Sequence, residues 1–256
     1  MKHNPTLTIV TGSDFTHAKS LINFLRSANQ HAPETKLIVY DLGMTPKQIQ
    51  RITKIFNYEI RKFDYSKYPA YFNIKIAAGE YAWKPVIIAE VAKQYCGTVL
   101  WMDAGNMIIA PLLPIIDEAL RTGFWRTSSG GFIGRWTHPL MLKYFNLPTD
   151  WNADVEMLAG GGVAFNTQND KALKLLTDWA KHAQIKDCIA PEGSNRKNHR
   201  QDQALLSVLA AMQNWPTPQN QVSMPVVFHQ DIESKYSPWR FTRRRIKSIW
   251  RWIVAR

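Results

Sequence analysis

The feature that most constrains the fold is a short apolar run that ends abruptly on an acid. Val99 to Met102 are four apolar residues without alternation, and Asp103 follows directly, ahead of the turn Ala104-Gly105-Asn106. Such an unbroken run is typical of a strand covered on both faces, as in an α/β sheet. Ligands of these folds bind at the carboxyl ends of the strands. Because a carboxylate is costly to desolvate, we expect Asp103 to meet a cation or a hydrogen-bond donor there.

The segments around this run alternate between strand and helix patterns. Strands are predicted over 7–11, 36–40 and 58–63, and helices over 17–30, 46–56 and 84–95. Further helices are predicted over 171–183 and from about 204 to 212. This order predicts an α/β fold with a mainly parallel, twisted sheet and helices on both faces.

The chain has 256 residues, and no linker or low-complexity block divides it. Its length and composition therefore predict a single large domain that spans residues 1–239. Two cysteines, Cys96 and Cys188, do not make a disulfide framework, and no Cys/His spacing matches a structural zinc site. No apolar segment has the length of a signal peptide or a membrane span. These features predict a cytoplasmic location.

The net charge of +12 is concentrated in a basic tail, residues 240–256, which contains seven basic residues and no acid. At helical spacing, its isoleucines and Trp250 fall on one face and its basic residues on another. This amphipathic pattern fits binding to an anionic membrane surface and, equally, packing on the protein's own domain. We expect no nucleic-acid partner, because the basic residues gather at one end without a recognisable binding module.

Three motifs lie in the second half of the chain. Gly160-Gly161-Gly162-Val163 lets the backbone bend sharply or approach a ligand closely. Asp202-Gln203 follows a polar loop and falls in the first turn of a predicted helix, where the helix dipole alone would favour an acid. His229 follows an apolar run and is either a ligand or an ordinary histidine at a strand end.

The order of these motifs resembles glycosyltransferases of the GT-A fold, in particular retaining nucleotide-sugar transferases of family eight. It is also similar to a poorly characterised branch with the signatures Trp-Met-Asp-Ala-Gly-Asn and His-Arg-Gln-Asp-Gln. The resemblance covers about residues 7–239. In the Asp-x-Asp motif of the family, which holds a divalent metal against the donor diphosphate, Asp103 stands at the first position.

The resemblance implies a role for each matching position. The catalytic residues would be Asp202 and Gln203, which orient the donor sugar or steady positive character at its anomeric carbon. Mn²⁺ or Mg²⁺ would be bound by Asp103 and His229, since such hard cations take carboxylates and accept an imidazole. The residues expected to bind the donor are Thr11, Gly12, Ser13, Lys84, Asp103, Asn106, Gly161, Gly162 and Lys235.

One departure from the family pattern weakens the metal site. Gly105 stands where the second acid of Asp-x-Asp is expected, and the neighbouring Asn106 offers only a neutral amide oxygen. The cationic loop residues Arg196, Lys197, His199 and Arg200 are an alternative source of positive charge.

We therefore expect an enzyme that transfers a sugar from a nucleotide-diphosphate donor to a glycan or glycolipid acceptor at the cytoplasmic face of a membrane. Residues 128–138, which contain several glycines, Arg135 and Trp136, are expected on the acceptor side. Two alternatives remain open: a sugar-nucleotide-binding protein without transfer activity, suggested by Gly105, and a basic membrane-surface adaptor, suggested by the tail.

Overall fold

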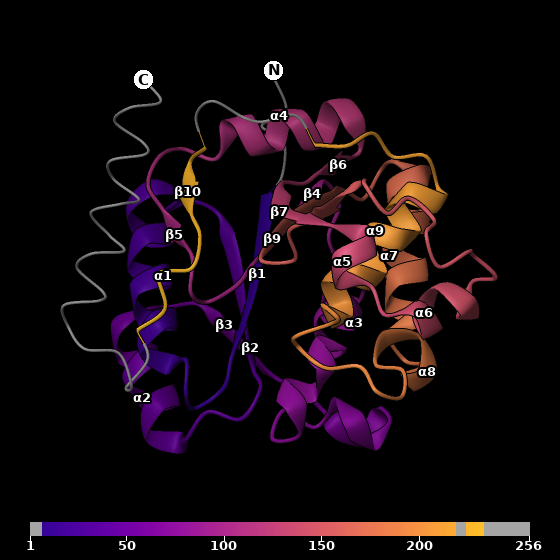
Figure 1. Ribbon diagram of the computed structural model, residues 1–256. Coiled ribbons are helices and arrows are strands. Elements are labelled where there is room, and N and C mark those ends of the chain that lie inside the picture. The colour runs from indigo at the N-terminus through magenta and orange to yellow at the C-terminus, as the bar shows by residue number, and fades with distance from the viewer. Residues whose placement is uncertain (1–6, 219–223, 233–256) are drawn as a thin grey trace.

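The computed structural model describes residues 7–218 and 224–232. Its main sheet contains six strands in the order β3-β2-β1-β4-β9-β6, and Figure 1 shows helices on both sides of it. In chain order these strands are β1 (Leu7–Ser13), β2 (Lys36–Asp41), β3 (Glu59–Lys62), β4 (Thr98–Met102), β6 (Phe124–Trp125) and β9 (Gly162–Asn166). The first four are parallel, whereas β9 runs antiparallel to both β4 and β6. The predicted mainly parallel α/β sheet is confirmed.

Two hydrophobic cores cover the two faces of the sheet. Strand residues alternate between them, because successive side chains of a strand point to opposite faces. Trp101 and Val163 belong to one core, and Leu100 and Ala164 to the other. Full burial of a larger apolar side chain such as Leu100 or Val163 contributes roughly 1.5–3 kcal/mol, so the alternation fixes the strand register.

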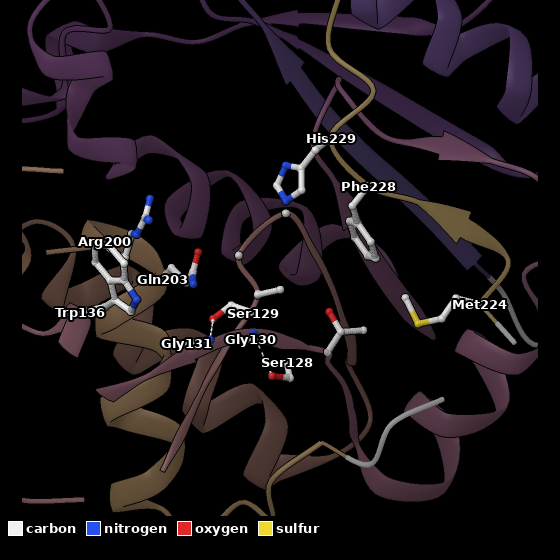
Figure 2. Close-up of a pocket in the computed structure, with 14 residues that line it drawn as sticks. Ser128, Ser129, Gly130, Gly131, Trp136, Arg200, Gln203, Met224, Phe228 and His229 are labelled. Carbon is white, nitrogen blue, oxygen red and sulfur yellow. Dashed lines mark hydrogen bonds between the residues drawn. The ribbon is translucent and has the colours of Figure 1, made fainter. Parts of the chain in front are cut away.

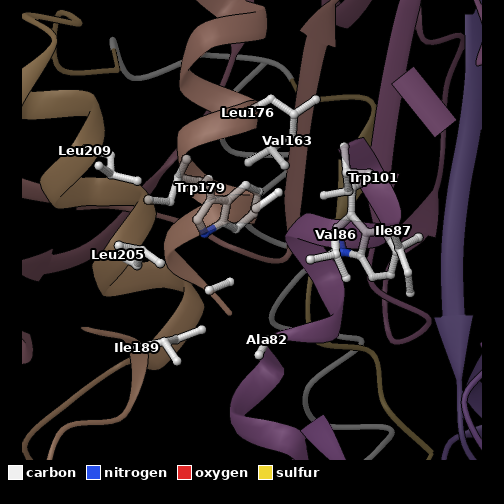
Figure 3. Packing of buried hydrophobic residues seen from close by; sticks show 14 of the residues in the cluster. Ala82, Val86, Ile87, Trp101, Val163, Leu176, Trp179, Ile189, Leu205 and Leu209 are labelled. Carbon is white, nitrogen blue, oxygen red and sulfur yellow. The ribbon is translucent and has the colours of Figure 1, made fainter. Parts of the chain in front are cut away.

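The first core is covered by α3, α7 and α9, and the second by α1, α2 and α4. The helices are α1 (Ala18–His31), α2 (Pro46–Ile55), α3 (Trp83–Gln94), α4 (Leu113–Thr122), α5 (Ile133–Trp136), α6 (Pro139–Tyr144), α7 (Asp170–His182), α8 (Lys186–Ile189) and α9 (Gln201–Met212). In Figure 3, Val86 and Ile87 of α3 lie beside Trp101, and Trp179 of α7 lies toward Leu205 and Leu209 of α9.

Two small antiparallel strand pairs lie outside the main sheet. β10 (Val226–Val227) pairs with β5 (Met107–Ile108), which brings residues near 229 beside the turn after β4. β7 (Ser128–Phe132) pairs with β8 (Glu156–Leu158). The first pair places His229 next to Asn106, although 122 residues separate them along the chain.

An unusual turn precedes α3. Residues Ala77 to Tyr81 form a left-handed turn in which all five φ angles are positive, between 47° and 63°. Each non-glycine residue in this conformation costs roughly 1–2 kcal/mol. At Gly79 a Cβ atom would lie 2.2 Å from the carbonyl oxygen of Phe72, so only glycine fits there. The turn ends at Tyr81, two residues before α3 begins at Trp83, the residue that precedes Lys84.

Within the described residues, no helix has the length and apolar character needed to cross a membrane. The basic tail of residues 240–256 and the predicted domain boundary at 239 lie outside the described residues, as does Lys235.

Candidate functional site

A pocket of about 510 Å³ lies at the carboxyl edge of the parallel strands, and we call it the strand-end pocket. It is lined by residues at or just after the ends of β1, β2 and β4, together with the start of α9 and the segment after β10. Its polar lining residues include Ser13, Asp14, Lys84, Asp103, Asn106, Arg196, Arg200, Asp202, Gln203, His229 and Asp231. This is the edge at which ligands of open α/β sheets bind.

Lys84 is the centre of a charged cluster in this pocket. Its side chain is 4 % exposed, and its Nζ lies 3.2 Å from Oδ1 of Asp103 and 3.1 Å from Oδ2 of Asp202. Nζ also donates a hydrogen bond to the carbonyl oxygen of Gly160 (3.0 Å). Trp101 Nε1 donates to Oδ1 of Asp103 (2.7 Å), so this carboxylate is held from two sides.

The burial of this cluster shifts the pKa values of its members. Burial alone would lower the pKa of Lys84, but the carboxylates of Asp103 and Asp202 outweigh it and raise that pKa, so the ammonium stays charged. Burial raises the pKa of Asp202 to about 6; the Lys84 charge opposes this shift and the Asp103 charge adds to it. Asp103 is the accessible carboxylate, with a side chain that is 39 % exposed.

The three glycines allow the backbone to approach these charges. A Cβ atom on Gly160 would lie 3.2 Å from Oδ2 of Asp202, and one on Gly161 would lie 3.2 Å from Oδ2 of Asp103. The carbonyl oxygen of Gly161 accepts hydrogen bonds from the backbone N of Asp103 (2.9 Å) and from Nδ2 of Asn106 (2.6 Å). At this motif the backbone therefore lies close to side chains of the protein itself. Its predicted close contact with a ligand stays a prediction.

Asn106 joins two segments of the site and is 2 % exposed. Besides its bond to Gly161, its Oδ1 accepts a hydrogen bond from the backbone N of His229 (3.4 Å). His229 has a positive φ of 58°, which turns the chain so that it lines the pocket. In this arrangement Asn106 positions the His229 segment, and its predicted direct contact with a donor stays a prediction.

Asp231 occupies the space that a side chain at position 105 would fill. A Cβ atom built on Gly105 would lie 2.1 Å from Oδ1 and 2.5 Å from Oδ2 of Asp231. Both residues line the strand-end pocket. No sequence motif singles out Asp231. Its one sequence signal is that it is an acid two residues after His229, and no spacing pattern links it to Gly105, which lies 126 positions earlier.

The cluster is not a preformed metal cage. In the part of the chain that the structure describes, no three His, Cys, Asp or Glu side chains form a group that could hold a metal ion. Mg²⁺ in nucleotide sites commonly takes one or two carboxylates and fills the remaining positions with water and phosphate oxygens. Asp103 and Asp231 are two carboxylates that line the strand-end pocket, so they are the residues that could supply such ligands.

The cationic loop is only partly directed toward the site. Arg196 and Arg200 line the strand-end pocket, and the guanidinium of Arg196 lies 5.5 Å from the ring centroid of Tyr81. His199 is fully buried, and burial lowers its pKa to about 4. It accepts a hydrogen bond from the backbone of His138 at Nδ1 and contacts the carbonyl oxygen of Ile189 at Nε2. His199 is therefore a neutral structural residue and supplies no charge to a ligand, contrary to the expectation for this loop.

A second pocket, of about 650 Å³, adjoins the first and is here called the β7 pocket (Figure 2). It is lined by Thr127, Ser128, Ser129, Gly130, Gly131, Trp136, Ala159, Gly160, Gly161, Arg200, Gln203, Met224, Phe228 and His229. Residues 128–131 and Trp136 come from the segment predicted to lie on the acceptor side.

The structure thus brings most of the predicted residues together. Lining the strand-end pocket are Gly12, Ser13, Lys84, Asp103, Asn106, Gly161, Asp202, Gln203 and His229. Thr11 is buried inside β1, because this strand continues to Ser13, two residues beyond its predicted end. Gly162 pairs with Met102 inside the sheet. The structure therefore places neither Thr11 nor Gly162 on the pocket wall.

Residues 1–89 match the family model described as a protein of unknown function (DUF1647). Curated proteins give no match. Among solved structures, galactosyltransferase LgtC in complex with donor and acceptor sugar analogs is similar at 16% identity and a TM-score of 0.51, covering 94% of this chain and 96% of LgtC. An active-site mutant of LgtC is similar at 13% identity and a TM-score of 0.50, covering 94% and 95% of the two chains. These similarities show the fold: the chain adopts the mixed α/β architecture of GT-A glycosyltransferases.

Proposed function

We propose that this protein is a glycosyltransferase that moves a sugar from a nucleotide-diphosphate donor to an acceptor. The observation that carries the proposal is the buried Lys84 held between Asp103 and Asp202 in the strand-end pocket of a GT-A fold. A buried cation between two carboxylates fixes their positions and contributes little to stability relative to apolar packing. Such an arrangement is expected where a site must be organised before its substrate arrives.

The donor diphosphate would bind beside Asp103, where the ammonium of Lys84, the guanidinium of Arg196 and a divalent cation would stabilise its charge. Lys84 and Arg196 line this space. Asp202 and Gln203, at the start of α9, would contact the sugar hydroxyls through carboxylate and amide groups. We keep Lys235 as a proposed phosphate contact on the strength of the sequence resemblance.

We further propose that Mn²⁺ or Mg²⁺ assists the reaction. Asp103 and Asp231, which line the same pocket, would hold the ion together with the diphosphate, and His229, which also lines it, is kept as the imidazole ligand that the sequence predicted. When bound, such an ion stabilises negative charge on the leaving diphosphate. Asp231 supplies the carboxylate whose absence at position 105 suggested a binding protein without transfer activity, so transfer is the function we favour.

In the proposed reaction, an acceptor hydroxyl oxygen forms a bond to the anomeric carbon of the donor sugar. The bond from that carbon to the diphosphate oxygen breaks, and the nucleoside diphosphate leaves with the electron pair. The hydroxyl proton is released to solvent or to the departing diphosphate. Asp202 would steady the positive character at the anomeric carbon.

The acceptor would be a glycan or glycolipid bound in the β7 pocket, which shares Gln203 and His229 with the strand-end pocket. We propose that the reaction takes place at the cytoplasmic face of a membrane, with the basic tail of residues 240–256 binding anionic lipids and residues 1–239 forming the transferase domain. Flotation with anionic vesicles at low and high salt tests the tail, since electrostatic binding weakens as salt rises.

The test of the function is a screen of nucleotide sugars for thermal stabilisation with and without Mn²⁺, followed by turnover of the donors that bind. A ligand that binds the folded state at 100 times its Kd stabilises it by about 2.7 kcal/mol. We expect at least one donor to stabilise the protein and to be consumed, and Asp103→Ala to abolish consumption while the protein remains folded. Undiminished turnover in that variant would contradict the proposal. If no sugar nucleotide binds while the basic tail proves essential, the membrane-surface adaptor is favoured instead.

A further inference from the structure

The β7 pocket has a charge distribution of its own. Among the described residues that line it, none is acidic, and Arg200 carries the one permanent charge. The remaining lining is small and polar along residues 127–131 and apolar at Met224 and Phe228. Figure 2 shows Arg200 and Trp136 together on one side of the pocket, with Met224 and Phe228 opposite.

Arg200 is held in place by an aromatic ring and not by an acid. Its guanidinium carbon lies 4.0 Å from the ring centroid of Trp136, and its backbone N donates to the carbonyl oxygen of Trp136 (3.1 Å). Arg135 lies over the same ring at 4.8 Å. Among the described residues, no carboxylate lies within ion-pair distance of either arginine.

Stacking of this kind orients a guanidinium while it leaves the N–H donors at its edge available. Those donors match the two oxygens of a carboxylate or a phosphate group, which can bind in a bidentate manner. A neutral sugar would leave the charge of Arg200 without a counterion. The pocket is therefore better suited to an anion than to an uncharged hydroxyl group.

From these observations we infer that the β7 pocket binds an acceptor saccharide that carries an anionic group, a carboxylate or a phosphate, and that Arg200 recognises this group. The inference rests on the proposed function and names its acceptor class. Arg200 lines both pockets, so an anionic group bound to it would place the adjoining sugar ring at the junction with the strand-end pocket. His229 and Gln203 also line both pockets and so lie at the same junction.

The experiment compares matched acceptors on the full-length protein, with a donor identified by the thermal screen. The acceptors are a neutral hexoside, the corresponding uronic acid glycoside and the corresponding sugar phosphate. A hydrogen bond to a charged group contributes enough that we expect at least a tenfold lower KM for an anionic acceptor than for the neutral one. The two anionic acceptors distinguish a carboxylate from a phosphate.

The variant Arg200→Gln should remove this preference by raising the KM of the anionic acceptor about tenfold or more, with a much smaller change for the neutral hexoside. Arg135→Gln is the matched control, because Arg135 contacts the same ring but does not line the pocket, and it should retain the preference. Binding of each acceptor, measured by calorimetry, gives a readout that does not depend on turnover.

Three results would overturn the inference: equal KM values for neutral and anionic acceptors, loss of preference in Arg135→Gln but not in Arg200→Gln, or weaker donor binding in Arg200→Gln without any change in acceptor selectivity. The last result would assign Arg200 to the donor diphosphate. In each case donor binding by the wild-type protein would still support the proposed function, whereas its absence would remove both.

Discussion

The carboxylate of Asp231 lies where a side chain on Gly105 would extend, within 2.1–2.5 Å of the position of its Cβ atom. The two residues are far apart in sequence and meet because β10 pairs with β5, directly after the turn that contains Gly105. The Asp-x-Gly turn has no second acid in its own sequence, but the segment after β10 places the carboxylate of Asp231 at that position.

Exchanging these two residues tests whether metal-dependent binding requires the carboxylate itself or its attachment to position 231. We expect Asp231→Asn to weaken Mn²⁺-dependent binding of a nucleoside diphosphate about tenfold, because a neutral amide binds a divalent cation less well than a carboxylate. Gly105→Asp alone should destabilise the protein, since two carboxylates would compete for one space. The double variant Gly105→Asp/Asp231→Gly should recover most of the binding, as the backbone at Gly105 is not left-handed. Calorimetric titration with and without Mn²⁺ checks this, and full binding by Asp231→Asn would refute it.

Lys84 should be the costliest ionic residue of the site to remove. Lys84→Met leaves Asp202 buried without its cation, and breaking a buried pair in this way costs about 3–5 kcal/mol of unfolding free energy. Adding Asp202→Asn should restore part of the loss, because the stranded charge is then absent. Urea denaturation measures each step.

A matched control for Lys84 is Lys67→Met, which removes the exposed ion pair between Lys67 and Asp64. Because water screens the charges of an exposed pair, the unfolding free energy of this variant should be close to that of the wild type. Equal losses of unfolding free energy in the Lys84 and Lys67 variants would show that the buried ion pairs of Lys84 contribute no more to stability than an exposed pair does.

Replacing Gly161 or Gly162 with alanine should affect donor binding and stability differently. Gly161→Ala places it 3.2 Å from Oδ2 of Asp103, so donor binding should fall while stability changes little. Gly162→Ala places it 2.7 Å from Cε1 of Phe228, and such overpacking costs roughly 1–3 kcal/mol. Thermal unfolding and donor titration of both variants separate these effects. The same pattern of loss in both would contradict the assigned contacts.

Local patterns predicted the parts of this molecule that depend on neighbours in sequence. The apolar run before Asp103 predicted a buried strand, because a strand covered on both faces is mostly apolar, and the position of Asp103 at the sheet edge followed. The left-handed turn at 77–81 was not predictable, because Ala-Ala-Gly-Glu-Tyr favours an ordinary helix and only tertiary packing imposes positive φ angles. Asp231 was missed because its partner position is set by strand pairing between distant segments, which no spacing rule encodes.

Activity and stability should change in opposite directions with pH, because both depend on Asp202. Burial raises the pKa of its carboxyl group from the ordinary value of 3.8 to about 6, so the folded protein binds this proton more tightly than the unfolded chain does. Between about pH 4 and pH 6 the unfolded chain loses the proton first, and the unfolding free energy should therefore fall as pH rises through this window. The ionised carboxylate, which pairs with Lys84 and is proposed to contact the donor sugar, is the form expected to act, so kcat/KM should rise as the pH passes through about 6 and level off roughly one unit above that pKa. Asp202→Asn should flatten the stability profile in that window. A kcat/KM that is constant from pH 4.5 to pH 7 in the wild type would show that Asp202 does not act as an ionised group.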